Sequence, residues 1–164
     1  MIATMDITER QMVFMREAIQ LSSKGMHLNE GGPFGCVIVR NDEIIGRGNN
    51  KVIALNDPTA HAEIMAIRDA CRQINFFQLD QCELYTSCEP CPMCLGAIYW
   101  ARIQNIFYAC TRKDAAMIGF DDDFIYQEIN KSMQVRAIPL QQMLQDEGLS
   151  VFGEWELKPD KIAY

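Results

Sequence analysis

The sequence predicts an α/β fold, namely a three-layer α/β/α sandwich whose helices cover both faces of a mixed sheet. Short apolar runs rich in β-branched and aromatic residues alternate along the chain with longer runs of helical periodicity. Two of the strand-like runs are joined by a tight turn, and because such a hairpin is antiparallel the sheet cannot be purely parallel. A chain of 164 residues that is 49% hydrophobic can fill one core, so we expect a single domain over residues 1–164.

The clearest elements lie before residue 111. In chain order they are a helix from Thr8 to about Gly25, strands over 36–40 and 43–49, a loop over 51–60, a helix over about 61–74, a strand over 82–87, a helix over 90–101 and a strand over 105–110. The first helix begins with a capping box, since Thr8 precedes Gln11 by three residues. The hairpin strands meet at an Asn41-Asp42 turn, and Pro90 stands near the start of its helix, where its missing N–H costs little.

The pattern weakens after residue 110. We expect a short helix over 113–117, followed by the acidic loop GFDDDF. Beyond it, the residues favour a helix near 123–130, a strand at VRAI over 135–138 and a helix over 139–146. The tail VFGEWELKPDKIAY shows no period that assigns it to either type of element.

Charge and cysteine content limit the classes of partner and compartment. The net charge is −7 and the pI is near 4.8, which argues against binding a nucleic-acid backbone. No apolar run reaches the roughly 18 residues that a membrane span needs. The N-terminus shows no basic leader before an apolar block, and the seven cysteines are an odd number, so we expect free thiols in a reducing cytoplasm.

Two short motifs, PTAHAEIMAIRDA and SCEPCPMCLGAIYW, carry the chemistry. Cys91 and Cys94 lie three residues apart in the first turn of a predicted helix, where they share a face and the helix dipole favours thiolates. Together with the neutral imidazole of His61 they would give three ligands that balance a Zn²⁺ ion and leave a fourth position for water. Zinc lowers the pKa of such a water to roughly 7, and Glu63, two residues after His61, is placed to move its proton.

Three other interpretations of these residues stay open at this point. A CxxC pair can be a redox site, although that leaves Glu63 without a role. Cys88 can be a fourth ligand, which would close the zinc site and make it structural. His61 can be an ordinary capping or core residue, although the matched CxxC favours ligation. His27 has no such company, and we expect it on the surface near the end of the first helix.

The two motifs together resemble the signature of the zinc nucleobase deaminases, H-x-E followed by P-C-x-x-C. The chain is similar to the cytidine-deaminase superfamily along nearly its whole length. Within that superfamily, GGPFG, NDPTAHAE, LYTSCEPCPMCLGAIYWARI, GFDDDFIY and a terminal aromatic resemble bacterial guanine deaminases. This resemblance implies a mixed five-stranded sheet, a homodimer with one Zn²⁺ per subunit, and hydrolysis of guanine to xanthine and ammonia in purine catabolism.

The resemblance also implies roles for residues around the zinc motif. Asn50 should hydrogen-bond the purine edge, Phe34 should stack on the ring, and the backbone N–H of Ala62 should contact the base. Asp122 should hold guanine and relay protons, while Glu63 protonates a ring nitrogen and then the departing amine. From the residues alone, Phe34 could equally belong to the core, Asn50 could form a turn, and the Asp run could be a solvated loop.

Two further aromatic residues belong to the pocket that the resemblance implies. Trp100 is a candidate wall residue, and Tyr164 at the end of the chain should help to close the pocket. The tail over about 150–164 would then close the active site of its own subunit or of the partner subunit.

Several other functions compete with guanine deamination. A tRNA adenosine deaminase shares NDPTAHAE and PCxxC, but the acidic charge and the FDDDF loop oppose RNA binding. Cytosine or cytidine deamination is a further alternative, because residues outside the zinc motif choose the base. A non-catalytic zinc-binding interaction module belongs to another class, and the intact Glu63 argues against it. We therefore expect a small purine base as the partner.

Overall fold

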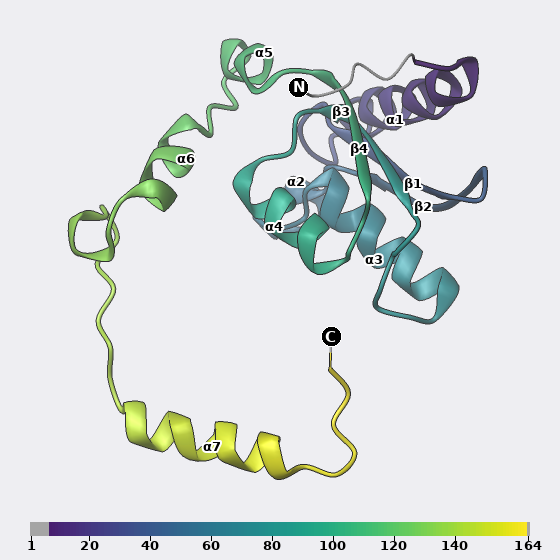
Figure 1. The fold of residues 1–164 in the computed structure, drawn as a ribbon. Helices are drawn as coiled ribbons and strands as arrows, with labels where there is room; N and C mark the ends of the chain where they lie inside the picture. Colours follow the sequence, from purple (N-terminus) through teal and green to yellow (C-terminus); the bar gives the residue numbers. More distant parts are fainter. Residues whose placement is uncertain (1–6, 164) are drawn as a thin grey trace. The chain divides into compact units, whose positions relative to one another are not determined.

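A mixed four-stranded sheet lies at the centre of the part of the chain that ends at Asp122 (Figure 1). The computed structural model describes residues 7–163, and the residues from Asp123 onward form a second compact unit. The strands are β1 (Gly35–Arg40), β2 (Glu43–Asn49), β3 (Glu83–Cys88) and β4 (Asn105–Cys110), in the spatial order β2-β1-β3-β4. β1 pairs antiparallel with both β2 and β3, whereas β3 and β4 are parallel, so the predicted mixed sheet is confirmed.

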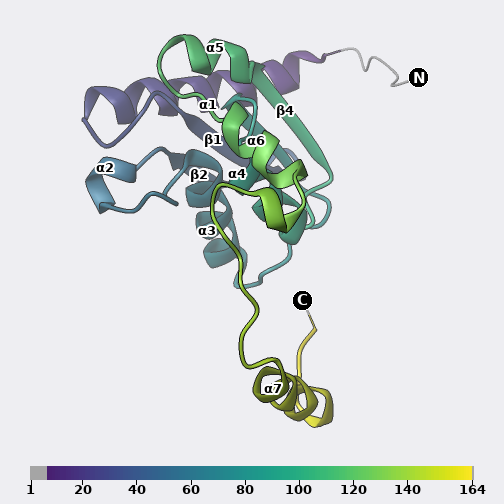
Figure 2. The same cartoon turned by 90° about the vertical axis from the view of Figure 1, so that its left-hand side faces the viewer.

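Helices cover both faces of this sheet, as Figures 1 and 2 show. The helices of the first unit are α1 (Glu9–His27), α2 (Val52–Leu55), α3 (Ala62–Ile74), α4 (Pro92–Trp100) and α5 (Arg112–Met117). Alternate residues of β1 point to opposite faces, so Val37 packs in the cluster of α1 while Ile38 packs in the cluster of α3 and α4. The predicted three-layer arrangement is therefore present in this unit.

The local signals in the sequence explain how these elements begin and turn. The Thr8 hydroxyl accepts the backbone N–H of Gln11 at 3.3 Å, and the Gln11 side chain accepts the backbone N–H of Thr8 at 2.9 Å, which confirms the capping box. Asn41 and Asp42 have φ values of 49° and 65°, as a type I′ hairpin turn requires. The loop expected over 51–60 contains one short helix, α2.

Helix α3 lies directly on the backbone of β2. A Cβ atom added at Gly48 would lie 2.2 Å from the carbonyl oxygen of Ala62, and one added at Gly46 would lie 2.5 Å from that of Ala66. Only glycine permits this approach of helix to strand. The close packing fixes where α3 begins, and therefore where the residues at its first turn lie.

The expected five-stranded sheet is wrong for the described residues, because the sheet has four strands. The segment VRAI begins at the end of a 3-10 helix, η1 (Met133–Val135), and continues without pairing to another strand. Pro139 follows immediately, and proline both lacks a backbone N–H and restricts the residue before it. Without this strand there is no described segment paired with the outer edge of β4.

The second unit matches the expectations in part. Its first helix, α6 (Asp123–Asn130), lies where a helix was predicted. The helix expected over 139–146 is wrong in its bounds, because α7 (Gln145–Leu157) begins near its end and extends into the tail. Asp146 and Glu147 in the first turn favour that start through the helix dipole. Gly148 and Gly153 interrupt the periodic spacing of apolar residues in α7. The sequence of the tail therefore does not by itself indicate a helix.

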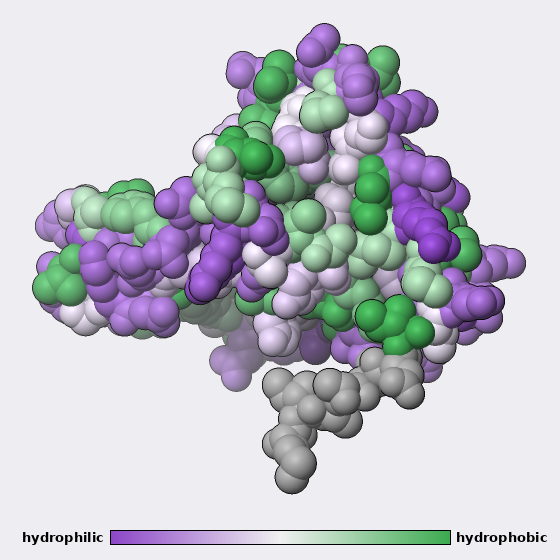
Figure 3. Space-filling model, turned by 90° about the horizontal axis from the view of Figure 1, so that it is seen from above, coloured by the Kyte–Doolittle hydropathy of each residue, from purple (hydrophilic) through white to green (hydrophobic). Residues whose placement is uncertain are grey.

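Hydrophilic side chains cover much of the surface seen in Figure 3, with separate hydrophobic patches between them. Within residues 7–163, none of the helices combines the length and the apolar character that crossing a bilayer requires. All seven cysteines are free thiols in the structure.

Candidate metal centre and active site

Two helix starts bring three metal-ligating side chains to one point. His61 is the residue immediately before α3, and Cys91 is the residue immediately before α4. Cys94 follows in the first turn of α4 and is fully buried. Nδ1 of His61 lies 3.5 Å from Sγ of Cys91 and 3.6 Å from Sγ of Cys94, and the three ligand atoms all lie within 4.8 Å of one another.

These separations fit a zinc ion. Tetrahedral zinc with Zn–S bonds of about 2.3 Å and Zn–N bonds of about 2.0 Å places its sulfur and nitrogen ligands about 3.5 Å apart. The two distances from His61 to the sulfurs agree with that edge. The donor set of two thiolates and one imidazole is also one that zinc prefers.

The three ligands are coupled electrostatically. The hydrogen bond from Cys94 lowers the pKa of Cys91 to about 4, and the neighbouring His61 acts in the same direction against the effect of burial. Conversely, the interaction with Cys91 and burial both raise the pKa of Cys94. The hydrogen bond with Cys91 raises the pKa of His61. A cation at this point would favour deprotonation of all three ligands, so proton release accompanies metal binding.

Cys88 does not join this cluster. Its thiol donates to the carbonyl oxygen of Thr111 at 3.6 Å, and burial raises its pKa to about 12. Among the described residues, the group of side chains close enough to hold one ion is His61, Cys91 and Cys94. Three protein ligands with room for a fourth are the arrangement of catalytic zinc, whereas closed structural sites use four.

Glu63 stands beside the metal cluster, in the first turn of α3. Its side chain is buried, with 6% of the residue exposed, and it accepts a hydrogen bond from the hydroxyl of Thr86 at 3.1 Å. Burial raises the pKa of this carboxyl. A carboxyl group held beside the ligands in this way can exchange a proton with a molecule bound at the metal.

A cavity of about 490 Å³ opens beside the metal cluster. This volume suits a small-molecule ligand. Six of the residues singled out from the sequence line the cavity: Phe34, Asn50, His61, Glu63, Cys91 and Asp122. The structure therefore gathers residues from five separate segments of the chain at one concave surface.

Asn50 is held rigidly at the wall of this cavity. It is 5% exposed, and its Oδ1 accepts the backbone N–H groups of Gly32 at 3.3 Å and Val52 at 3.2 Å. Because Oδ1 is occupied in this way, the amide nitrogen of Asn50 is the end that can donate to a ligand. Gly31 is required beside it, since a Cβ there would lie 2.0 Å from Oδ1.

An aromatic pair forms another part of the wall. The rings of Phe34 and Phe120 meet edge to face, with centroids 4.9 Å apart. A Cβ at Gly32 would lie 2.8 Å from the ring of Phe120, so glycine allows the loop before β1 to approach this ring. The pair offers an apolar surface to a planar ligand.

Asp122 closes the set at the end of the loop that follows α5. It is half-buried, and burial raises its pKa while the charge of Arg112 acts in the opposite direction. The carboxyl group lines the same cavity as Glu63.

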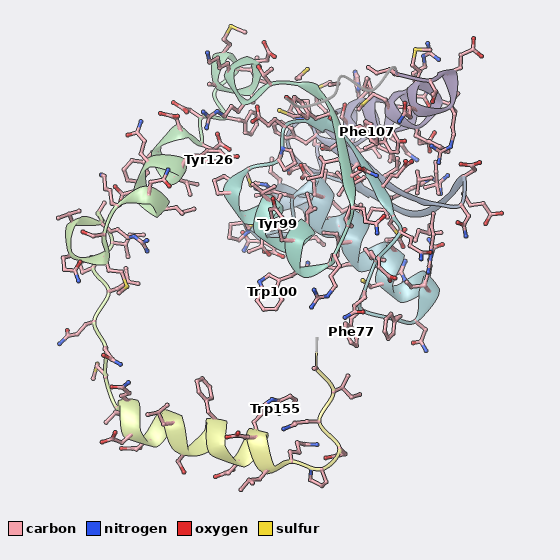
Figure 4. All side chains as sticks on the ribbon, in the orientation of Figure 1. Phe77, Tyr99, Trp100, Phe107, Tyr126 and Trp155 are labelled. Atoms are coloured by element: carbon pink, nitrogen blue, oxygen red, sulfur yellow. The ribbon has the colours of Figure 1, made fainter. Side chains whose placement is uncertain are left out.

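Two of the described residues to which the resemblance assigned a place at the base, Ala62 and Trp100, are not among those that line the cavity. Ala62 is buried and is the first residue of α3. At that position the backbone N–H has no acceptor within the helix, so this N–H is the group that Ala62 can offer to a ligand. Trp100 projects from the end of α4 with 69% of its surface exposed, next to the exposed Tyr99 (Figure 4). Tyr164 lies outside the described residues.

Sequence reasoning missed several other lining residues, among them Glu89, Arg112 and Phe120. Glu89 belongs to the SCEPC motif and Phe120 to GFDDDF. Both motifs were assigned a role through other residues, namely the cysteines and Asp122. Arg112 carries no local signal, because only the parallel pairing of β3 and β4 brings it near Glu89.

Comparisons with known proteins agree with this geometry. Residues 8–110 match the family described as the cytidine and deoxycytidylate deaminase zinc-binding region. Guanine deaminase of Bacillus subtilis (strain 168) is 53% identical over 92% of this chain and 97% of its own length. An X-ray structure of guanine deaminase from Bacillus subtilis matches with a TM-score of 0.91 at 51% identity, over 96% of this chain and 99% of that one.

A second group of relatives acts on RNA by name. The tRNA-specific adenosine deaminase of Aquifex aeolicus (strain VF5) is 35% identical over 79% of this chain and 85% of its own length. The lower identity and coverage place this chain nearer to the Bacillus enzyme than to the Aquifex one. With the zinc-ligand geometry and the match over residues 8–110, the chain belongs to the cytidine and deoxycytidylate deaminase family of zinc-binding domains.

Proposed function

We propose that this chain catalyses the zinc-dependent hydrolytic deamination of guanine to xanthine and ammonia. The observation that carries the proposal is the buried carboxyl of Glu63, next to a three-ligand zinc site in the wall of a cavity of small-molecule size. The identity of 53% to a guanine deaminase of nearly equal length supports guanine as the substrate.

The residues of the chain divide the reaction between them. His61, Cys91 and Cys94 would hold the zinc ion, which would supply an acidified water as the nucleophile. Glu63 accepts one proton from the water and delivers it to a ring nitrogen of guanine. It then accepts a second proton, from the hydroxyl group that has added to the ring carbon, and delivers it to the departing amine, which leaves as ammonia. Thr86 holds the carboxyl group through its hydroxyl, so the proton is carried by a group of fixed position.

The wall of the cavity orients the base. Asn50 offers its amide nitrogen to an acceptor on the purine edge, while Phe34 and Phe120 form an apolar surface against the ring. The backbone N–H of Ala62 points from the start of α3 and is suited to an oxygen or nitrogen of the base. Asp122 holds the amino side of guanine and relays protons to the solvent.

A screen for ammonia release tests the proposal. The purified zinc-loaded protein is assayed with guanine, adenine, cytosine, their nucleosides and a tRNA anticodon stem-loop. We expect release from guanine at a rate far above that from the other substrates. Preferential release from the stem-loop would replace the proposal with tRNA adenosine deamination, and no release from any substrate would favour a zinc-binding interaction module.

We also propose a cytoplasmic homodimer with one zinc ion per subunit. Free cysteines are compatible with a reducing compartment, and exposed aromatic side chains at the end of α4 leave apolar surface that a second subunit can cover. Light scattering on a sizing column, with metal analysis of the same peak, gives the subunit number and the zinc content. A monomer over the micromolar range would contradict the dimer.

A further inference from the structure

The side chain of Glu89 joins the metal-binding loop to the start of α5. Glu89 follows β3 directly and stands two residues before the ligand Cys91. Its Oε2 accepts the backbone N–H of Arg112 at 3.1 Å, and its own backbone N–H donates to the carbonyl oxygen of Cys110 at 2.8 Å. Glu89 is half-buried and lines the cavity, so its contact with Arg112 is made at the edge of the site.

Helix α5 and the loop after it form one hydrogen-bonded piece. At its start, Thr111 and Asp114 form a capping box. At its end, the N–H of Gly119 donates to the carbonyl of Ala116 and that of Phe120 donates to the carbonyl of Ala115, both at 3.0 Å. These bonds join the loop to α5 as far as Phe120, two residues before Asp122.

Arg112 is the first residue of α5, so its N–H has no acceptor within the helix. The side-chain oxygen of Glu89 supplies the acceptor that this N–H otherwise lacks, and what the contact requires is an oxygen at this reach. If Glu89 is shortened or removed, this N–H loses its acceptor at the edge of the cavity. The start of α5 then keeps its capping box, the strand pairing, and the bonds that Thr111 and Cys110 accept from Cys88 and from the Glu89 backbone, but it loses the side-chain link.

We propose that Glu89 is a positioning residue, which holds Asp122 in place at the cavity through the start of α5. The inference rests on the proposed function, because it assigns Asp122 a part in that reaction. Glu89 acts through the backbone of Arg112, and its carboxylate makes no bond to the substrate. Glu89 thus contacts the first residue of α5, and Asp122 lies at the end of the loop that follows this helix.

Three substitutions separate position from charge. Glu89→Ala removes the acceptor, Glu89→Asp keeps the charge but withdraws the oxygens by one methylene, and Glu89→Gln keeps an acceptor oxygen at the same reach without the charge. We expect kcat/KM for guanine to fall about tenfold in the Ala and Asp variants and to stay within about threefold of the parent in Glu89→Gln. Glu43→Ala, at the exposed start of β2, is the matched control and keeps the parent value. A low value in Glu89→Gln together with a normal one in Glu89→Asp would overturn the inference, because charge would then be what matters.

A double-mutant comparison tests whether the effect passes through Asp122. In a protein that already carries Asp122→Ala, the further change Glu89→Ala should lower kcat/KM much less than it does alone, since coupled residues are non-additive. If the two losses multiply, Glu89 acts independently of Asp122 and the inference fails.

Hydrogen exchange gives a result that does not depend on turnover. The backbone amides of residues 111–122 should exchange faster in Glu89→Ala and Glu89→Asp than in the parent, Glu89→Gln or the Glu43→Ala control. Unchanged exchange in Glu89→Ala would overturn the link between Glu89 and α5. If instead the parent enzyme releases no ammonia from guanine while these amides respond as expected, the proposed function fails and the link stands.

Discussion

Glu63 shows how one residue can be fixed in place by packing and one hydrogen bond. It lies in the first turn of α3, is buried, and accepts the hydroxyl of Thr86. A buried carboxyl without a structural partner charge is costly, so such a group is retained where proton transfer uses it.

Glu63→Gln is therefore expected to lower turnover strongly and to leave zinc binding intact. The amide has the same shape but cannot carry a proton, so we expect kcat to fall by at least about 10²-fold. Ammonia release and zinc content are measured on the same preparation. Zinc lost together with activity would show that Glu63 supports the metal site instead of the chemistry.

Cys88 and Cys94 give a second prediction at the same scale. Cys94→Ser should lose zinc, because it removes one of three ligands, whereas Cys88→Ser should keep a full equivalent, because Cys88 donates to Thr111. Metal analysis after gel filtration decides between them. Zinc loss in Cys88→Ser would restore the closed four-ligand site as an interpretation.

At the scale of elements, the contact between α3 and β2 governs where the catalytic residues lie. Gly48→Ala places a Cβ against the carbonyl of Ala62, and we expect it to destabilise the fold by about 1–3 kcal/mol through overpacking. Gly96→Ala is the control, because a Cβ added at Gly96 would meet no atom within 4 Å apart from the backbone of its own helix. Alanine also favours a helix more than glycine does, so the stability of this variant should stay equal or rise. Thermal melting compares the two variants, and equal melting temperatures would contradict the close packing.

The elements also show which structural features a sequence can reveal. The capping box at Thr8 and the turn at Asn41-Asp42 depend only on residues close together in the chain, so a short stretch of sequence is enough to predict them. The strand expected at VRAI depends on a neighbour to pair with, which no local pattern specifies. The contact between Glu89 and Arg112 joins residues far apart in the chain, so it appeared only with the parallel register of β3 and β4.

For the molecule as a whole, the metal joins two segments of chain. His61 precedes α3, whereas Cys91 and Cys94 belong to α4, so an ion held by all three links both helices. Zinc that binds the folded chain and not the unfolded one stabilises it, by about 4 kcal/mol at a thousandfold excess over its dissociation constant.

Removing zinc with a chelator is therefore expected to lower the melting temperature by several degrees and to abolish ammonia release together. Adding zinc back should restore both, because the ligands remain on the chain. Glu63→Gln serves as the control, since it should show the same melting shift without any activity to lose. A melting temperature that ignores the chelator would mean that the site contributes nothing to folding.

The two site motifs could be recognised in the sequence because His-Ala-Glu and Pro-Cys-Pro-Met-Cys each place their functional groups at the start of one helix. Only some of the residues that line the cavity around them could be predicted from the sequence. Asn50 and Asp122 came from resemblance, and the outward course of Trp100 depends on how α4 meets the sheet.

The glycine contact under α3 has one more consequence. Because the backbone of β2 at Gly46 and Gly48 lies against the backbone of α3, no side chain of these two residues separates the strand from the helix that bears the proton carrier. A larger residue at either position would push this helix, and the carboxyl group on it, away from the strand. The place of the proton carrier therefore depends on two residues that belong neither to the metal cluster nor to the cavity wall.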